Sequence, residues 1–341
     1  MRRWSALANS LLTVLTALGA GALAMAVLGH SPLEAYAELF RGAFVGKFNL
    51  GGTLERFVPL LLTALAFAVS SKVAVFNVGV EGELYLGAIA AAWAGVAFGG
   101  MPSPLHISLC LALAMGVGAA WAAVPGALKA YYDVNEVCTT ILANYVAVFL
   151  TSYLVNHPLA SGLGAPQTAP VAQSARLFRL LPPSQANAGL FIALATLVLV
   201  YWVVHHSTLG YRMRAVGENR GYAAHVGIRP EPVMVWGMAA SGALGGMAGA
   251  IQVLGVFGYF VDNFSPGIAF DGMLAALIAR NDIRLVPVLA FFLAALKAGA
   301  LGMERFTGIP KALVDAIIAV FILLAAMEGL FLLRRRARKE A

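Results

Sequence analysis

Residues 207–232 read STLGYRMRAVGENRGYAAHVGIRPEP, the longest stretch of this chain with the composition of water-soluble helix and turn. Its arginines make it basic, and Glu218, Asn219 and its glycines make it polar and easy to bend. Strongly apolar segments lie on both sides of it. A segment of this kind between apolar segments is either a connector or a docking element, and we expect a docking element.

The composition places the rest of the chain in a membrane. Of 341 residues, 60% are hydrophobic and 11% are charged, and the mean hydropathy is +0.82. A soluble domain carries about 25% charged residues, so this chain is predicted to lie in lipid. Only helices or closed barrels span a bilayer, and the apolar runs do not alternate with period two. The sequence therefore predicts a helical bundle, and its 36 glycines suit close helix contacts.

We predict an all-α polytopic membrane protein with about ten transmembrane helices, forming a single domain over residues 1–341. Residues 7–28 could instead be a signal peptide, because residues 22–24 (Ala-Leu-Ala) resemble a cleavage site. The run is longer than a signal core, so we favour an uncleaved first span. Residues 30–52 are predicted to be a mixed loop. The expected spans are 7–28, 54–75, 76–98, 105–128, 137–155, 189–204, 233–254, 268–279, 285–302 and 312–333.

The basic residues predict the orientation of these spans. With both termini in the cytoplasm, about fifteen Lys and Arg fall inside and seven outside, as the positive-inside rule requires. Residues 207–232 are then a cytoplasmic loop, and the proline-rich residues 156–188 are an extracytoplasmic loop. The net charge of +7 is explained by this orientation, so we expect a lipid bilayer and no nucleic acid as partner.

Two stretches of the sequence look alike, each with an acidic residue, a glycine and a leucine before an alanine-rich segment. They are residues 80–84 (VEGEL) and 270–274 (FDGML). Because they are five spans apart, they predict an inverted repeat of spans 2–5 against 7–10, the alternative being chance similarity. Placing the carboxylates of Glu81 and Asp271 at membrane depth costs free energy. They either gate a substrate path or cap the helix that follows, and both can hold.

Other polar residues in apolar segments are candidates for the same path. Asn135 and Glu136 lie at the start of the fifth span, and Asn144 lies within it. For Asn144 an interhelical hydrogen bond is favoured over a ligand contact. Cys110 and Cys138 suggest neither a disulfide nor a metal site. No catalytic, metal-binding or phosphate-loop motif is present in the sequence, so we expect no enzyme activity and no cofactor.

Four stretches resemble the permease subunits of bacterial ABC importers in the simple-sugar and branched-chain-amino-acid group, and most closely its nucleoside branch. Residues 76–83 (FNVGVEGE, followed by Leu-Gly-Ala) carry the hallmark. Residues 129–145, 209–228 and 270–281 resemble the group's fourth-to-fifth-span region, coupling loop and eighth segment. The resemblance covers about residues 54 to 320. The sequence departs from the group's pattern at two places. Glu83 stands where the group usually has Gln or a similar polar residue, and residues 282–284 (Asp-Ile-Arg) are more charged than the usual continuation.

The resemblance implies a type II ABC importer-like fold in the bacterial cell (inner) membrane. It also implies the partners: two ABC ATPase subunits, a second permease subunit (identical or paralogous) and an extracytoplasmic substrate-binding protein. In the coupling loop we expect helices at residues 211–216 and 222–226, with a turn at 217–221. The coupling residues implied are Arg212, Arg214, Gly217, Glu218, Asn219, Ala223 and Gly227. The candidates for the substrate pathway or gate are Asn77, Glu81, Asn135, Glu136, Asn144, Phe270 and Asp271.

Alternatives to this interpretation remain. An ion-coupled secondary transporter would also explain a repeat and buried carboxylates, but it needs no docking helices in the cytoplasmic loop. For the substrate we expect nucleosides, with simple sugars of the ribose or galactose type as the alternative.

Overall fold

The computed structural model describes residues 31–162 and 164–309, together with 19, 21–23, 25–27, 29, 312–316 and 319 near the ends of the chain. In these residues the secondary structure is helical, apart from two isolated β-bridges. The contacts divide the chain into two compact units, one formed by Met1–Thr53 with Phe292–Ala341 and the other by Leu54–Phe291. The second unit contains the predicted coupling and pathway residues.

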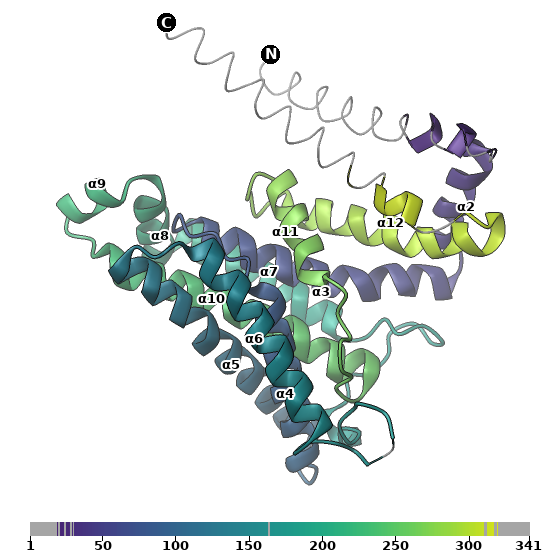
Figure 1. Ribbon diagram of the computed structural model, residues 1–341, viewed down its shortest axis with the longest axis horizontal. Helices are drawn as coiled ribbons and strands as arrows, with labels where there is room; N and C mark the ends of the chain where they lie inside the picture. The colour runs from purple at the N-terminus through teal and green to yellow at the C-terminus, as the bar shows by residue number, and fades with distance from the viewer. Residues whose placement is uncertain are drawn as a thin grey trace, which may run out of the picture. The chain divides into compact units, whose positions relative to one another are not determined.

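The helices follow the apolar runs of the sequence (Figure 1). They are α2 Pro32–Phe44, α3 Lys47–Ser71, α4 Val80–Ala97, α5 Ser103–Tyr132, α6 Glu136–Asn156, α7 Gly189–His206, α8 Thr208–Glu218, α9 Arg220–His225, α10 Pro230–Ile251, α11 Ile268–Ile278 and α12 Val286–Thr307. A short 3-10 helix, η1, covers Gln173–Ala175, and α10 continues as a π-helix, η2, over Gln252–Phe257.

Six described helices are long and apolar enough to cross a membrane: α3, α5, α6, α7, α10 with η2, and α12. The prediction of a polytopic, all-helical membrane protein is therefore confirmed. α11 has only 11 residues, about 16 Å of helix, which is half the thickness of a bilayer core. The first and tenth predicted spans fall mostly outside the described residues.

The prediction of a mixed loop over residues 30–52 is wrong. Ser31-Pro32 begins α2, with proline at the helix position that tolerates it, and α3 begins already at Lys47. Glycines let α2 approach α12 closely: a side chain at Gly299 would collide with the carbonyl oxygen of Leu39. The buried residues of α2 are accordingly the small ones, Ala35, Gly42 and Ala43, and their packing is not revealed by a mixed loop pattern.

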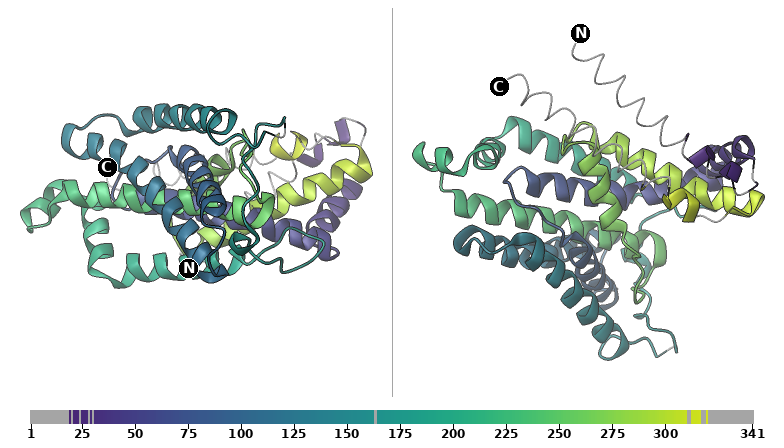
Figure 2. Two further views of the ribbon diagram at one scale, coloured as in Figure 1. Left: turned by 90° about the horizontal axis from the view of Figure 1, so that it is seen from below. Right: turned by 45° about the horizontal axis from the view of Figure 1, so that its top comes forward.

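The core of the second unit lies around α10, which packs against α4 and α5 (Figures 1 and 2). The small residues between Ser241 and Gly249 make this contact. A side chain at Gly246 would collide with the carbonyl of Ala114 on α5, and one at Gly249 would collide with the carbonyl of Leu84 on α4. Small residues permit such close approach of helix backbones, so α10 is a buried central helix.

The described residues of the loop between α6 and α7 hydrogen-bond to η2 and to the residues that follow it. Leu177 N donates to the Leu254 carbonyl at 2.9 Å, and Val171 N donates to the Gly258 carbonyl at 2.9 Å. Thr168 N donates to the Phe260 carbonyl at 3.0 Å. α6 ends at Asn156 and α7 begins at Gly189, close to the boundaries predicted for this loop, and the loop backbone bonds carbonyls of η2 and of the residues that follow it.

Candidate functional site

Two helices of the second unit, α4 and α11, begin beside each other. α4 starts at Val80 after a non-helical stretch, and α11 starts at Ile268 after another. The Glu81 carboxylate accepts hydrogen bonds from Ser265 Oγ at 2.6 Å, Gly267 N at 3.2 Å and Ala269 N at 2.8 Å. Glu81 therefore caps a helix, as one of the two interpretations expected, but the capped helix is α11 rather than its own.

Tyr85, one turn after Glu81, holds the same segment. Its hydroxyl donates to the Ser265 carbonyl oxygen at 3.0 Å and accepts from Ser265 N at 3.1 Å. Its ring lies 4.9 Å from that of Phe264. Residues four apart share one helix face, so this face of α4 fixes the chain that leads into α11.

The start of α4 is itself fixed by two buried asparagines. Asn77 Nδ2 donates to Glu83 Oε1 at 2.8 Å and to Ser241 Oγ at 2.9 Å. Asn144 Oδ1 accepts from Gly82 N at 2.7 Å, and its Nδ2 donates to the Val78 carbonyl at 2.8 Å. The interhelical hydrogen bond favoured for Asn144 is therefore confirmed. Ser241 lies about 16 Å along α10 from Pro230. The interruption between α3 and α4, residues 72–79, therefore contacts α10 well inside the bundle.

The other predicted pathway residues do not all join this cluster. Phe270 and Asp271 are in the first turn of α11, and the ring of Phe270 is 40% exposed. Asn135 and Glu136 lie in the turn between α5 and α6, at the opposite end of α6 from Asn156. The structure brings Asn77, Glu81, Asn144 and Asp271 into one region and leaves Asn135 and Glu136 outside it.

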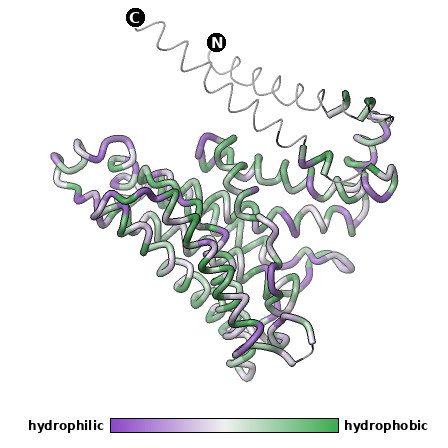
Figure 3. The backbone as a smooth tube through the Cα atoms, viewed as in Figure 1, coloured by the Kyte–Doolittle hydropathy of each residue, from purple (hydrophilic) through white to green (hydrophobic). Residues whose placement is uncertain are grey.

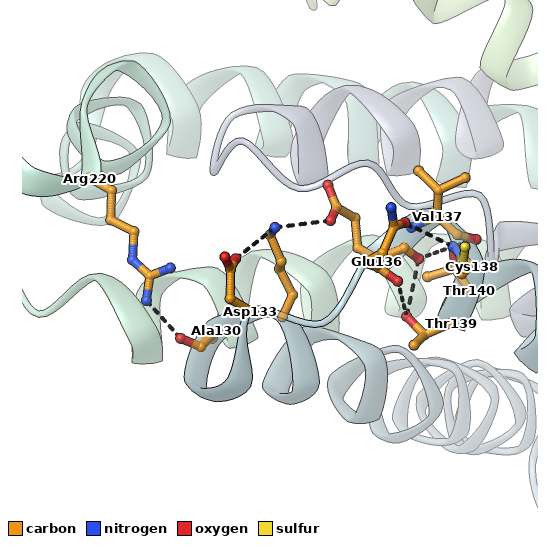
Figure 4. Close-up of polar contacts among 10 residues, drawn as sticks. Ala130, Asp133, Glu136, Val137, Cys138, Thr139, Thr140 and Arg220 are labelled. Carbon is orange, nitrogen blue, oxygen red and sulfur yellow. Dashed lines mark hydrogen bonds and ion pairs between the residues drawn. The ribbon is translucent and has the colours of Figure 1, made fainter.

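The α5–α6 turn forms a polar cluster of its own (Figure 4). Asn135 Oδ1 caps α6 by accepting from Val137 N at 3.0 Å and Cys138 N at 3.1 Å. Lys129 Nζ lies 2.9 Å from Asp133 and 3.3 Å from Glu136. The hydrogen bond from Lys129 and its charge hold the pKa of Asp133 below its ordinary value.

Residues 207–232 form the two predicted short helices, α8 and α9, beyond the end of α7. Hydrophilic residues gather there, as Figure 3 shows. Ser207 Oγ caps α8 by accepting from Gly210 N at 3.1 Å, and Asn219 Oδ1 caps α9 by accepting from Tyr222 N at 2.9 Å. The predicted five-residue turn at 217–221 is wrong, because Asn219 alone separates the helices and supplies the cap. Gly227 has a φ of +86°, which favours glycine.

The helices α8 and α9 are anchored to the turn that precedes α4. A side chain at Gly217 would collide with the carbonyl oxygen of Lys72, so the two backbones touch. Val216, next to it, is buried in an apolar cluster with Val73, Val75 and Met238. Desolvation by burial lowers the pKa of Lys72, the charge of Asp282 raises it and that of Arg214 lowers it. Sequence reasoning missed residues 72–75, which read as the end of a span.

A second anchor joins α9 to α5 and α10. Arg220 Nη2 donates to the Ala130 carbonyl at 2.7 Å, as Figure 4 shows, and lies 3.2 Å from Glu231 Oε1. Ala223 of α9 is fully buried in the apolar cluster that contains Val216 and Val73.

The outer surface of these two helices carries most of the predicted coupling residues. Arg212, Glu218 and Asn219 are exposed, and Arg214 is half-buried. Four large apolar side chains also lie exposed on residues 207–232: Leu209 at 61%, Tyr211 at 60%, Tyr222 at 66% and Val226 at 50%. The segment thus has one face fixed to the bundle and another face that combines exposed charges with exposed apolar groups.

A scan against protein families matches residues 49–326 to the family described as "Branched-chain amino acid transport system / permease component". The guanosine ABC transporter permease protein NupP of Bacillus subtilis is 36% identical, covering 96% of this chain and 94% of that protein. The glucose ABC transporter permease protein TsgB13 of Haloferax volcanii is 34% identical, covering 96% and 89%. The nucleoside ABC transporter permease protein NupB of Lactococcus lactis is 32% identical, covering 90% and 87%. No solved structure matches the chain.

Proposed function

This chain belongs to the family of branched-chain amino acid transport system permease components, and from that premise we propose that it is the permease subunit of a nucleoside-importing ABC transporter. The observation that carries the proposal is the anchoring of α8 and α9 to residues 72–75. Two relatives support the substrate, since they are named for guanosine and for nucleosides. The alternative is a sugar, because a relative named for glucose is nearly as similar.

The proposed topology has ten spans, with both termini in the cytoplasm and an inverted repeat of spans 2–5 against 7–10. Residues 156–188 are then extracytoplasmic and residues 207–232 form the cytoplasmic coupling loop in the bacterial inner membrane. In support, the two look-alike stretches each begin a helix after an interruption, and these helices meet at Glu81. Transporter sites commonly lie where interrupted helices of two repeats meet.

We assign the energy source to separate ATPase subunits that dock on α8 and α9. A second permease copy or paralogue completes the pathway, and a binding protein delivers the substrate from outside. A shift of α8 would push on the Lys72 backbone through Gly217 and on Val73 and Val75 through Val216. The same chain then leads through Asn77, which is bonded to α4 and α10. Docking of the ATPases is thereby coupled to the interruption at α4.

The substrate is tested by uptake in cells that lack this chain and in cells that express it again. We expect radiolabelled guanosine uptake to disappear with the chain and to return with it. Excess unlabelled uridine should compete, whereas glucose and ribose should not. Persistent nucleoside uptake in the deletion strain, together with loss of sugar uptake, would overturn the substrate assignment.

The coupling route is tested by replacing Gly217 with Ala. The added Cβ collides with the Lys72 carbonyl, so α8 must move away from the turn. We expect guanosine uptake to fall by about tenfold or more, while the purified complex still assembles and hydrolyses ATP. The matched control is Gly221→Ala on α9, where the nearest atom to an added Cβ is 3.5 Å away. Equal uptake by the two variants would refute the route through Lys72.

A further inference from the structure

α6 buries a narrow stripe of small and polar residues and leaves the opposite side uncovered by the described residues. The buried residues are Thr140, Asn144, Ala147, Thr151 and Val155. On the uncovered side Tyr145 is 61% and Phe149 is 70% exposed. Ser152 and Asn156 follow at spacings of three and four, so these four residues lie along one face of the helix.

At the C-terminal end of this α6 face, Ser152 and Asn156 contact the carboxylate of Asp262, which lies between η2 and α11. Ser152 Oγ donates to Asp262 Oδ2 at 2.8 Å, and Asn156 Nδ2 is 3.4 Å from the same oxygen. Asp262 Oδ1 accepts no hydrogen bond from the described residues, and no Lys or Arg among them forms an ion pair with this carboxylate. One side of Asp262 is therefore fixed, while its second oxygen keeps its hydrogen-bonding capacity.

An aromatic cluster lies on both sides of Asp262 in the sequence, formed by Phe257, Phe260 and Phe264 together with Tyr85 of α4. The ring of Phe264 lies 4.9 Å from Tyr85, 5.5 Å from Phe260 and 5.8 Å from Phe257. Phe257 is 36% exposed. Asp262 is thus two residues from Phe264 of this cluster and bonded to Ser152, and Phe149 and Tyr145 lie about one and two turns before Ser152, toward the N-terminus of α6.

In the middle of α6, the same face carries the polar hydroxyl of Tyr145, which is unfavourable in contact with lipid. Tyr145 lies near the middle of α6, a candidate span, and its hydroxyl makes no hydrogen bond with the described residues. An unsatisfied hydroxyl in the hydrocarbon region is costly. The face is better suited to a passage that carries water and a polar, partly planar solute.

We propose that Asp262, Phe149, Tyr145 and the Phe257–Phe264 cluster form a nucleoside-binding site in the translocation pathway. The free oxygen of Asp262 accepts hydrogen bonds from the ribose 2′- and 3′-hydroxyls. The planar base stacks on the exposed aromatic rings, which bind bases without regard to their identity. This assignment rests on the proposed function and adds to it the residues that recognise the two halves of the substrate.

The ribose contact is tested with Asp262→Asn in the complete transporter, reconstituted in proteoliposomes with its ATPases, partner permease and binding protein. The amide oxygen can still accept from Ser152, but the amide NH2 that replaces the free oxygen accepts no hydrogen bond. We expect guanosine uptake to fall about tenfold or more, because the hydrogen bonds of the ribose 2′- and 3′-hydroxyls to a charged group are lost. Uptake of 2′,3′-dideoxyguanosine should change less than about twofold.

Equal losses for the two nucleosides, or no loss for either, would overturn the ribose contact. A wild-type complex that transports neither guanosine nor uridine would instead overturn the proposed function itself. The two failures are thereby distinguishable.

The base contact is tested with Phe149→Ala, for which Phe149→Trp preserves an aromatic face. We expect guanosine uptake to fall about tenfold in the alanine variant and to stay within about twofold of wild type in the tryptophan variant. ATP hydrolysis stimulated by the loaded binding protein should persist in both, so fewer nucleosides are moved per ATP. The matched control is Phe191→Ala on α7, an aromatic residue that is 58% exposed. Identical uptake by the two alanine variants would overturn the base contact.

Discussion

The starts of α4 and α11 share a sequence pattern but are stabilised in different ways. In both, a glycine follows the acidic residue and allows a neighbouring helix to approach. A Cβ on Gly82 would lie 2.9 Å from Ala147 of α6, and one on Gly272 would lie 2.8 Å from Ala64 N of α3. The acidic residues differ, because Glu81 reaches away from its own helix to cap α11. The glycine of the shared pattern therefore indicates close helix packing. The acidic residue does not have the same function in the two stretches.

The two helix starts also differ in the number of side chains that hydrogen-bond their first turns. The start of α4 is bonded by Asn77 and by Asn144, which come from the preceding turn and from α6. At the start of α11, Gly267 N and Ala269 N bond to Glu81, and Ile268 N bonds to Ser265 Oγ, which itself donates to Glu81. We therefore expect α11 to depend on one side chain, whereas α4 can lose one support and keep the other.

The largest expected effect comes from Glu81→Ala. It removes three hydrogen bonds to one carboxylate and leaves buried donors unpaired, so we expect it to destabilise the protein by about 3 kcal/mol or more. Thermal unfolding of the detergent-purified protein, followed by the loss of its monodisperse peak, measures the effect. Glu218→Ala, at an exposed residue for which we predict a role in coupling, is the control. A Glu81→Ala protein that is as stable as this control would contradict the dependence of α11 on Glu81.

Much of the fold follows from the sequence because its signals are local. The apolar runs predicted α5, α6, α7 and α10 to within a few residues. The polar stretch 207–232 predicted two short helices between spans. These signals depend on residues within one helix or turn, where composition and spacing are informative.

The contacts of the candidate site were less predictable because they join distant parts of the chain. Glu81 carries a capping signal, but nothing near it identifies Ala269, 188 residues away, as its partner. The contact of Gly217 with Lys72 depends on backbone approach, which leaves no spacing pattern. Asn135 and Glu136 resemble pathway residues because they are polar and next to an apolar run, but they form a helix cap and an ion pair in a turn.

A smaller effect is expected for Asn144→Ala. The variant leaves Gly82 N and the Val78 carbonyl without their partner, which we expect to cost about 2 kcal/mol. Because Asn77 still bonds Gly79 N, the loss should be smaller than for Glu81→Ala in the same unfolding measurement. Cys138→Ala, at an exposed position on the same helix, serves as the control. If Asn144→Ala were the more damaging variant, the two helix starts would not differ in the number of their supports.

The smallest effect is expected for Glu83→Gln, two residues from Glu81 on the same helix. Glu83 is 1% exposed, and its Oε1 accepts a hydrogen bond from Asn77. Its Oε2 has no hydrogen-bond partner among the described residues, and none of their lysines or arginines forms an ion pair with it. This environment lacks the several donors that surround Glu81, so it is suited to an uncharged side chain.

Glutamine has the same shape and keeps the acceptor for Asn77, so Glu83→Gln should change the unfolding free energy by less than about 0.5 kcal/mol and guanosine uptake by less than about twofold. Glu83→Met removes the acceptor and should cost about 1–2 kcal/mol, which shows that the assay responds at this position. A loss for Glu83→Gln as large as that for Glu81→Ala would mean that the Glu83 charge itself is required. The two carboxylates of α4 would then be equivalent, and the contrast between a capping carboxylate and a merely buried one would fail.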